Sequence, residues 1–219
     1  MSWRAGSWVL LVFCLTLLIQ LPASWVAHGL GWAATGISGT VWRGQARHIG
    51  SIGPIEWDWR PWRLQAQTRV GVQGQAWALD VRGWPWAWHA RITPWQAPDG
   101  APAEHRLVGQ WQGVIQLAGQ GRRCSAAQGR IAVVDLALAA PWSLTLGQGV
   151  IEMDCRQGWR LLGRLDLAGQ HQASVDADLL ARQARLRVSV EESAAITPLL
   201  RSAQWLAPGG RELQRGVEW

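Results

Sequence analysis

The stretch Gly39-Thr40-Val41-Trp42-Arg43-Gly44 lies directly behind an apolar N-terminal segment, and it decides how the rest of the chain is interpreted. Side chains alternate in character along this hexapeptide and just beyond it, with Thr40, Trp42 and Gln45 set against Val41 and Ala46. Such alternation predicts a strand, and a glycine at each end relaxes the backbone. The hexapeptide therefore marks the point at which a membrane anchor ends and a β-rich body begins.

The segment before the hexapeptide is apolar over the length that a membrane helix needs. Residues 8–21 have the sequence WVLLVFCLTLLIQL, and tolerable apolar character extends from Gly6 to Ala27. About 20 residues in a helix cross the roughly 30 Å of hydrocarbon in a bilayer. We therefore predict one transmembrane helix over residues 7–27, in which Cys14 acts as a small apolar residue.

A cleaved signal peptide is the competing interpretation of this segment, because such peptides also carry an apolar core. The candidate cleavage sites are poor, since Trp25 stands where a small residue is needed and Pro22 disfavours a cut after Ser24. Arg4 is the only charged side chain before the span, and the positive-inside rule leaves it in the cytoplasm. The prediction is a cytoplasmic tail over residues 1–6 and an exported body.

Beyond a short, Gly-rich linker over residues 28–38, apolar and polar residues alternate persistently. Segments with this pattern are separated by glycine-containing pairs, and examples are residues 69–73, 76–81, 113–117, 174–179 and 186–190. The pattern is typical of an antiparallel β-meander with one apolar face and one face that carries Gln, Arg and Asp. We therefore predict a mainly β fold, a curved or rolled antiparallel sheet, over residues 39–219.

The least patterned part of this body, residues 94–104, predicts a long exposed loop. Weak internal matches accompany it: Trp62-Arg63-Leu64 resembles Trp159-Arg160-Leu161, and Leu-Ala-Gly-Gln occurs twice. The hypothesis is that the body consists of two similar halves, about residues 39–96 and 105–219.

The C-terminal end departs from the strand pattern. Thr197 and Pro198 predict the start of a short helix, with Thr197 as its cap and Pro198 at its first position. Pro208-Gly209-Gly210 ends this helix, and residues 211–219 are expected to return as a last edge strand.

Composition limits the functions that the chain can have. Among the 219 residues there are 21 arginines and no lysine, and the formal net charge is +6. The arginines are scattered among acidic residues, which disfavours a nucleic-acid-binding surface. The absence of lysine excludes a Walker A phosphate loop, a Schiff-base lysine and a Ser-x-x-Lys dyad.

Tryptophan takes the place of the other aromatic residues, with 18 Trp, one Phe and no Tyr. Trp84, Trp86 and Trp88 have a spacing of two and would project from one face of a strand. They could form an aromatic platform for a partner, an acyl chain or a sugar, but we favour packing in the core or at a membrane interface. Pro85 lacks the N–H of an interior strand and predicts that this segment lies at a sheet edge.

Motifs for catalysis are missing from the sequence. The five histidines show neither His-x-His nor His-x-x-x-His spacing. The Gly-x-Gly pairs lack the third glycine and the following helix of a phosphate-binding loop, and no Gly-x-Ser-x-Gly elbow occurs. We therefore expect no enzymatic activity, no metal and no cofactor.

Cys124 and Cys155 are the only cysteines outside the predicted span. In an exported body such a pair is more often a disulfide than anything else, because a C-x-x-C redox motif is absent and two cysteines alone cannot complete a tetrahedral zinc site. We predict that they are bonded and stabilise the fold by roughly 3 to 4 kcal/mol.

The order of these features resembles the type II secretion system protein N family: an apolar anchor, a Leu21-Pro22-Ala23 exit, the hexapeptide, two later cysteines and a Gly-rich C-terminal end. Members are single-pass inner-membrane proteins of the general secretion pathway in Gram-negative bacteria. The resemblance implies an inner-membrane protein with a periplasmic β domain and a structural role among other secretion components. The residues expected to be structural or to face a partner are Gly39, Thr40, Val41, Trp42, Gly44 and Trp57.

A second function stays open beside this one. An N-terminal anchor followed by a long curved β-meander with an apolar face also resembles the bacterial AsmA-type lipid-handling proteins. A lipid-binding role needs a continuous concave apolar face of several hundred Å² left uncovered by any helix. The two functions differ in whether this face is filled by its own side chains or open.

Overall fold

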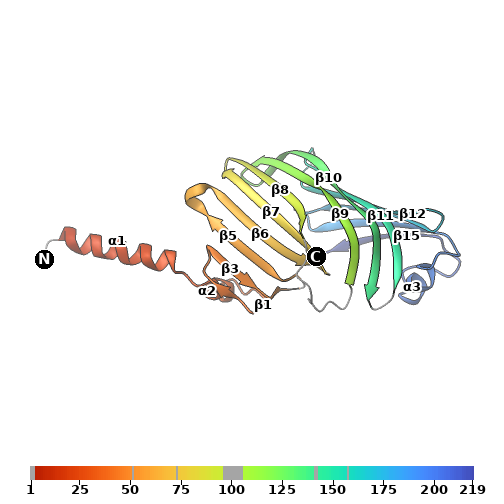
Figure 1. Ribbon diagram of the computed structural model, residues 1–219, viewed down its shortest axis with the longest axis horizontal. Helices are drawn as coiled ribbons and strands as arrows, with labels where there is room; N and C mark the ends of the chain where they lie inside the picture. The colour runs from red at the N-terminus through yellow and green to blue at the C-terminus, as the bar shows by residue number, and fades with distance from the viewer. Residues whose placement is uncertain (1–2, 51, 73, 96–105, 141–142, 157) are drawn as a thin grey trace. The chain divides into compact units, whose positions relative to one another are not determined.

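The computed structural model describes residues 3–50, 52–72, 74–95, 106–140, 143–156 and 158–219. The fold is mainly β, with an open antiparallel arrangement of strands and a short C-terminal helix, which confirms the predicted class (Figure 1). The chain divides into two compact units, residues 1–72 (unit 1) and residues 73–219 (unit 2). The predicted long loop over residues 94–104 lies almost entirely outside the described residues.

Unit 1 begins with two helices where one was predicted. Helix α1 spans Trp3–Ile19 and α2 spans Ala23–Gly29. The break falls at Pro22, which has an extended backbone (φ −66°, ψ 133°). A proline also disfavours the helical conformation in the residue before it, so a single helix over residues 7–27 does not form. Among the described residues, no helix combines the length and the apolar composition needed to cross a membrane.

The strands of unit 1 are short and antiparallel. Four of them lie side by side in the order β2 (Ser38–Gly39), β3 (Arg43–Ala46), β5 (Ile55–Arg60) and β6 (Gln65–Val72). A separate pair is formed by β1 (Ala34–Thr35) and β4 (His48–Ile49). The 3-10 helix η1 (Pro61–Arg63) connects β5 to β6, and Leu64 completes this turn in the left-handed conformation, with φ of 52°.

Unit 2 is a meander in which each strand pairs with the next along the chain. Its strands are β7 (Gln75–Trp84), β8 (Ala87–Trp95), β9 (Arg106–Gln120), β10 (Arg123–Ala140), β11 (Leu144–Asp154), β12 (Arg160–Leu167), β13 (His171–Asp178), β14 (Gln183–Val190) and β15 (Glu212–Glu218). The alternation that predicted these strands comes from a two-residue period, which puts neighbouring side chains on opposite faces.

The register of unit 2 separates an apolar face from a polar face. The buried cluster of the apolar face contains Ala90, Ile115, Leu117, Cys124, Ile131 and Cys155. Ala90 is directly opposite Leu117 across β8 and β9, so residues of different strands meet in one core. Arg91 and Gln116 are the next pair along and belong to the polar face.

The segment from Trp84 to Trp88 forms a hairpin between β7 and β8 and not the predicted edge strand. Trp84 is opposite Ala87, and Pro85 lies in the turn between them. The proline is tolerated there because a turn position does not need its N–H for the strand ladder. Strand β8 lies between β7 and β9, so the segment belongs to the inside of the sheet of unit 2.

The C-terminal helix forms where predicted, as α3 (Thr197–Ser202), and β15 is the predicted last strand. The capping prediction is wrong by one residue, because Ile196 occupies the cap position. Thr197 is almost fully buried, and its Oγ1 donates a hydrogen bond of 2.8 Å to the carbonyl oxygen of Glu191. This bond ties the helix to the end of β14.

Candidate functional site

The hexapeptide forms the turn of a hairpin, which corrects the single strand predicted for it. It starts at the end of β2 and leads into β3, and Gly39 pairs with Gly44 across the two strands. Gly39 has a φ of 91°, and a Cβ there would lie 2.5 Å from the carbonyl oxygen of Arg43. The amide of Thr40 donates to that same oxygen at 2.8 Å and closes the turn. Only glycine combines this backbone with this approach.

Trp57 packs on the turn from the neighbouring strand β5. It lies opposite Gly44, where a Cβ would be 2.5 Å from Cζ2 of the indole. The indole Nε1 of Trp57 donates to the carbonyl oxygens of Thr40 and Val41, both at 3.1 Å. Gly44 therefore leaves room for the ring, and the ring N–H donates to two carbonyl oxygens of the turn.

Trp42 and Val41 connect this turn to the end of helix α1. Nε1 of Trp42 donates to the carbonyl oxygen of Leu18 at 2.8 Å, and the amide of Val41 donates to that of Leu21 at 3.0 Å. The last four carbonyls of a helix have no partner within it, so Trp42 satisfies a group that the helix leaves free. We call Leu18, Leu21, the hexapeptide and Trp57 the joint.

The structure thus brings together all six residues of the predicted motif. Sequence reasoning missed the contribution of Leu18 and Leu21, because they take part through backbone carbonyls, which leave no trace in side-chain pattern. The amide of Trp59 donates to the carbonyl oxygen of Trp42 at 2.6 Å and extends the joint to the end of β5. Hydrogen-bonded backbone and indole groups dominate the joint, so it suits a mechanical role better than chemistry.

An ion pair between Arg60 and Asp58 lies beside the joint. Arg60 Nη2 lies 2.6 Å from Asp58 Oδ2, and this hydrogen bond holds the pKa of the Asp58 carboxyl below its usual value of 3.8. Asp58 is also opposite Arg43 of the hexapeptide, whose charge lowers the same pKa further. The carboxylate therefore stays ionised beside two cations at neutral pH.

The two cysteines are bonded, as predicted, with 5.3 Å between their Cα atoms. Trp88 and Trp159 stack near the disulfide, with ring centroids 5.6 Å apart. Their Nε1 atoms donate to the carbonyl oxygens of Gly121 and Arg122 in the β9–β10 turn. The disulfide is buried among core side chains, so it serves stability and not redox exchange.

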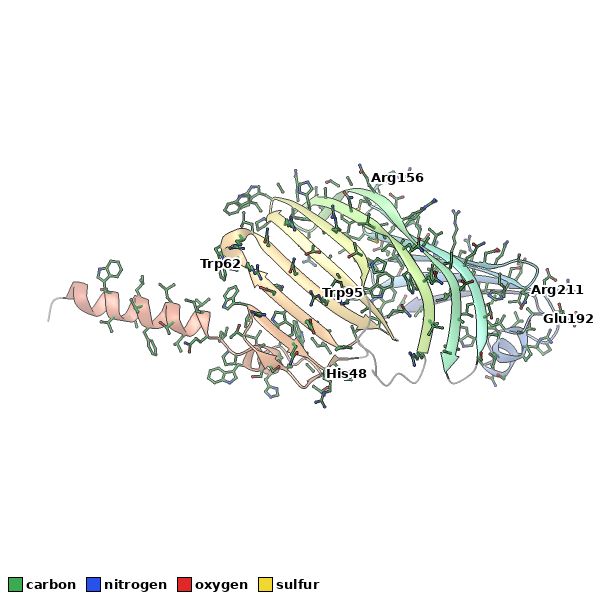
Figure 2. All side chains as sticks on the ribbon, viewed as in Figure 1. His48, Trp62, Trp95, Arg156, Glu192 and Arg211 are labelled. Carbon is green, nitrogen blue, oxygen red and sulfur yellow. A yellow bond between two sulfur atoms is a disulfide. The ribbon has the colours of Figure 1, made fainter. Side chains whose placement is uncertain are left out.

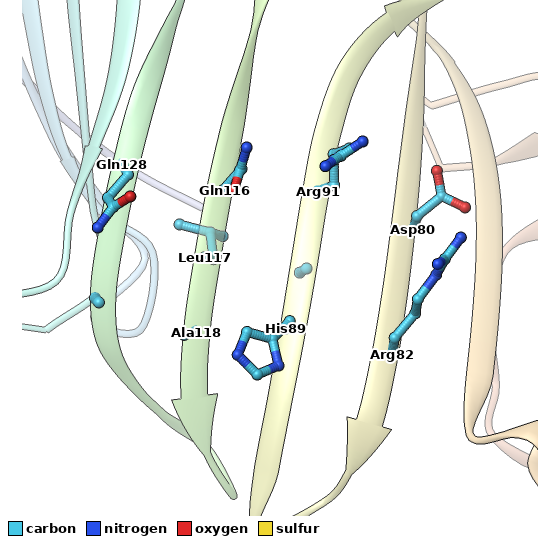
Figure 3. Close-up of a pocket in the computed structure, with 10 residues that line it drawn as sticks. Asp80, Arg82, His89, Arg91, Gln116, Leu117, Ala118 and Gln128 are labelled. Atoms are coloured by element: carbon cyan, nitrogen blue, oxygen red, sulfur yellow. The ribbon is translucent and has the colours of Figure 1, made fainter.

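A cavity of about 410 Å³ lies on the polar face over β7 to β10 (Figure 3). Asp80, Arg91, Gln116 and Gln128 form one row across the four strands, and Arg82 and His89 lie beside them. These side chains offer hydrogen bonds and charges of both signs, but no nucleophile paired with a base. Within the described part of the chain, no group of three or more His, Cys, Asp and Glu residues is placed to hold a metal.

In comparisons with known proteins, no family model, no curated protein and no solved structure matches the chain. A functional proposal therefore rests on the joint, on the two faces of unit 2 and on the order of features along the sequence.

Proposed function

We propose that the chain is a structural component of the type II secretion apparatus, anchored in the bacterial inner membrane by its apolar N-terminal segment, of which α1 is the longest helix, although the 17 residues of α1 alone fall short of a full span. The N-terminus lies in the cytoplasm, and both β units lie in the periplasm. The chain contributes no catalysis and binds no cofactor. It acts as an anchored partner for other inner-membrane or periplasmic secretion components, and so supports the export of folded proteins across the outer membrane.

The joint is the observation that carries this proposal. An apolar helix whose last turn is hydrogen-bonded to the first hairpin of the following sheet holds that sheet at a fixed distance from the end of the helix. A flexible linker would be sufficient if the helix were only a tether. The hexapeptide, on which the resemblance to the secretion family rests in part, forms the centre of the joint, so the motif has a physical role in the anchoring itself.

The lipid-handling alternative is favoured by one part of the apolar face. Leu165, Val175 and Leu186 lie on this face in β12 to β14 and are only half-buried. At the other end of the same face the side chains fill the space themselves, because Trp77 packs edge-on against Trp111 at 5.0 Å and the Trp88–Trp159 stack lies over the disulfide. The end of the face around the disulfide is therefore filled by its own side chains, which shortens the continuous open surface that lipid binding needs, and this supports the structural role.

Orientation is tested by fusing a reporter that fluoresces only in the cytoplasm after Trp219. We expect the fusion to stay dark, because Arg4 keeps the N-terminus in the cytoplasm and α1 carries the rest across. The same reporter placed before Met1 is the matched control and should fluoresce. A bright C-terminal fusion would contradict the proposed orientation.

The two functions are separated by what the full-length protein carries when it is purified in mild detergent. A secretion component should retain only the sub-stoichiometric phospholipid of a detergent-solubilised membrane protein. A lipid handler should retain phospholipid in near-stoichiometric amount, and replacing the half-buried Val175 by Glu should release it. Lipid that is retained by the unaltered chain and lost from V175E would favour the alternative.

A further inference from the structure

The charge-free part of the chain continues well past helix α1. From Ala5 to Trp42 the sequence contains no Asp, Glu, Lys or Arg. This stretch includes α1, α2 and the turn of the joint. An exposed stretch without charge, with tryptophans at its end, suits the hydrocarbon layer and its interface with water.

Helix α1 is short for the hydrocarbon layer. Its 17 residues extend over about 26 Å at 1.5 Å per residue, compared with the roughly 30 Å core of a typical bilayer. Arg4 lies in its first turn, which shortens the apolar part further. A short apolar span draws its flanking residues into the interface or thins the bilayer around it. The residues that follow Ile19 are the flanking residues that can be drawn into the interface.

Helix α2 has the side chains that an interfacial position requires. Ala23 and Ala27 are buried against unit 1, whereas Trp25 is 71% exposed. Leu30 and Trp32, just after the helix, are 58% and 55% exposed. The small residues thus face the protein and the large apolar residues face outward. Tryptophan is enriched at the interface between hydrocarbon and water because its ring is apolar and its N–H is polar.

The joint keeps α2 close to the end of α1. Only three residues separate Ile19 from Ala23, and both sides of that connection are tied to the hexapeptide through Leu18 and Leu21. Trp62 in η1, three residues after the Trp59 that bonds to Trp42, is 74% exposed (Figure 2). Arg63 follows it directly and is also exposed.

We infer that α2 lies in the periplasmic interface of the bilayer, with Trp25, Leu30 and Trp32 in contact with lipid, so that the joint rests on the membrane surface. The inference rests on the proposed anchoring by α1. The ligand is the bilayer itself, because the exposed apolar surface of α2 continues directly from α1, whose large apolar side chains are 49% to 69% exposed.

The test uses the full-length protein in nanodiscs of neutral and anionic phospholipid, with an environment-sensitive fluorophore on one introduced cysteine. Cys14 is replaced by Ser, and labelling is done without reductant so that the Cys124–Cys155 disulfide stays intact. Labels are placed by Leu10→Cys in α1, Leu30→Cys after α2 and Gln214→Cys in β15. Lipids with a quencher near the headgroup or deep in the acyl chain report the depth of each label.

We expect the label at position 30 to be quenched severalfold more by the shallow quencher than the label at position 214. The label at position 10 should respond most to the deep quencher. Quenching at position 10 without quenching at position 30 would overturn the interfacial placement and leave the anchoring intact. No quenching at position 10 would overturn the anchoring itself. A blue-shifted but unquenched label at position 30 would mean that protein covers α2, which also overturns the inference.

Matched variants show whether the tryptophans cause the placement. Trp25→Ala removes a ring that is 71% exposed, so no core packing is lost, and it should reduce shallow quenching at position 30 severalfold. Trp86→Ala removes a ring of unit 2 that is 64% exposed and should leave this quenching unchanged. Equal effects of the two variants would contradict a specific role of α2 at the interface.

Discussion

At the residue scale, the indole N–H of Trp42 makes one of the hydrogen bonds that link the hexapeptide to the end of α1 and the residues after it. Trp42→Phe keeps most of the ring but removes the donor to Leu18, so the last turn of α1 loses a hydrogen bond. We expect a local loss of about 1 kcal/mol, which corresponds to about a fivefold faster exchange of the Val41 amide that is bonded to Leu21. Hydrogen exchange followed by mass spectrometry of the hexapeptide measures this change.

Trp62→Phe is the control for this variant, because Trp62 is in the same unit and 74% exposed. Exchange in the hexapeptide should be the same in this variant as in the unaltered protein. If Trp42→Phe left the exchange unchanged, or if both variants accelerated it equally, the hydrogen bond would not hold the joint together.

At the element scale, hairpins fix the register of unit 2, and Gly119 in β9 is a position where they allow no side chain. A Cβ at Gly119 would collide with the ring of Trp88 and with the backbone of Arg123 across the β9–β10 hairpin. Gly119→Ala should therefore destabilise unit 2 by about 1–3 kcal/mol, as overpacking does. Gly216→Ala in β15 is the matched control, because nothing lies within 4 Å of a Cβ there.

The expected effect of Gly216→Ala on the free energy of unfolding is within about 0.5 kcal/mol. Chemical unfolding of the two variants in detergent, followed by the fluorescence of the tryptophans, measures the difference. Equal stabilities would mean that the packing of Trp88 over β9 is looser than the geometry implies.

An element could be predicted from sequence where its pattern is local. Strands β13 and β14 follow from local alternation, because a period of two needs no knowledge of distant residues. The hairpin at the hexapeptide could not be predicted in this way. Its turn depends on the left-handed backbone of Gly39 and on the ring of Trp57, and these act across strands that are apart in sequence.

Two further differences between the predicted and the observed elements also depend on information that local alternation does not contain. The alternating tryptophans predicted a strand from Trp84 to Trp88. Instead, the chain turns at Pro85, because the residues before it belong to β7 and those after it return as β8, which pairs with β7. The break at Pro22 was visible as an exit from the apolar segment, yet apolar character alone does not show that α2 resumes one residue later. The disulfide was predictable because only two cysteines lie outside the apolar segment.

At the scale of the whole molecule, an apolar helix and a hydrogen-bonded joint precede most β strands of the two units. The polar face of unit 2 carries rows such as Asp80, Arg91, Gln116 and Gln128, which offer a partner both charges and amides. Partner binding through such rows would weaken with salt, because at 0.1 M ionic strength the interaction between exposed charges is largely screened beyond about 10 Å.

The proposed role in secretion is tested most directly in a strain of the native host from which this protein is deleted. The measurement is the amount of a secreted enzyme in the periplasm divided by its amount in the medium. We predict that the deletion raises the ratio severalfold and that the unaltered chain restores it, while a resident periplasmic protein stays inside the cell as a control for leakage. An unchanged ratio, together with near-stoichiometric phospholipid on the purified protein, would contradict the secretion role and favour lipid handling.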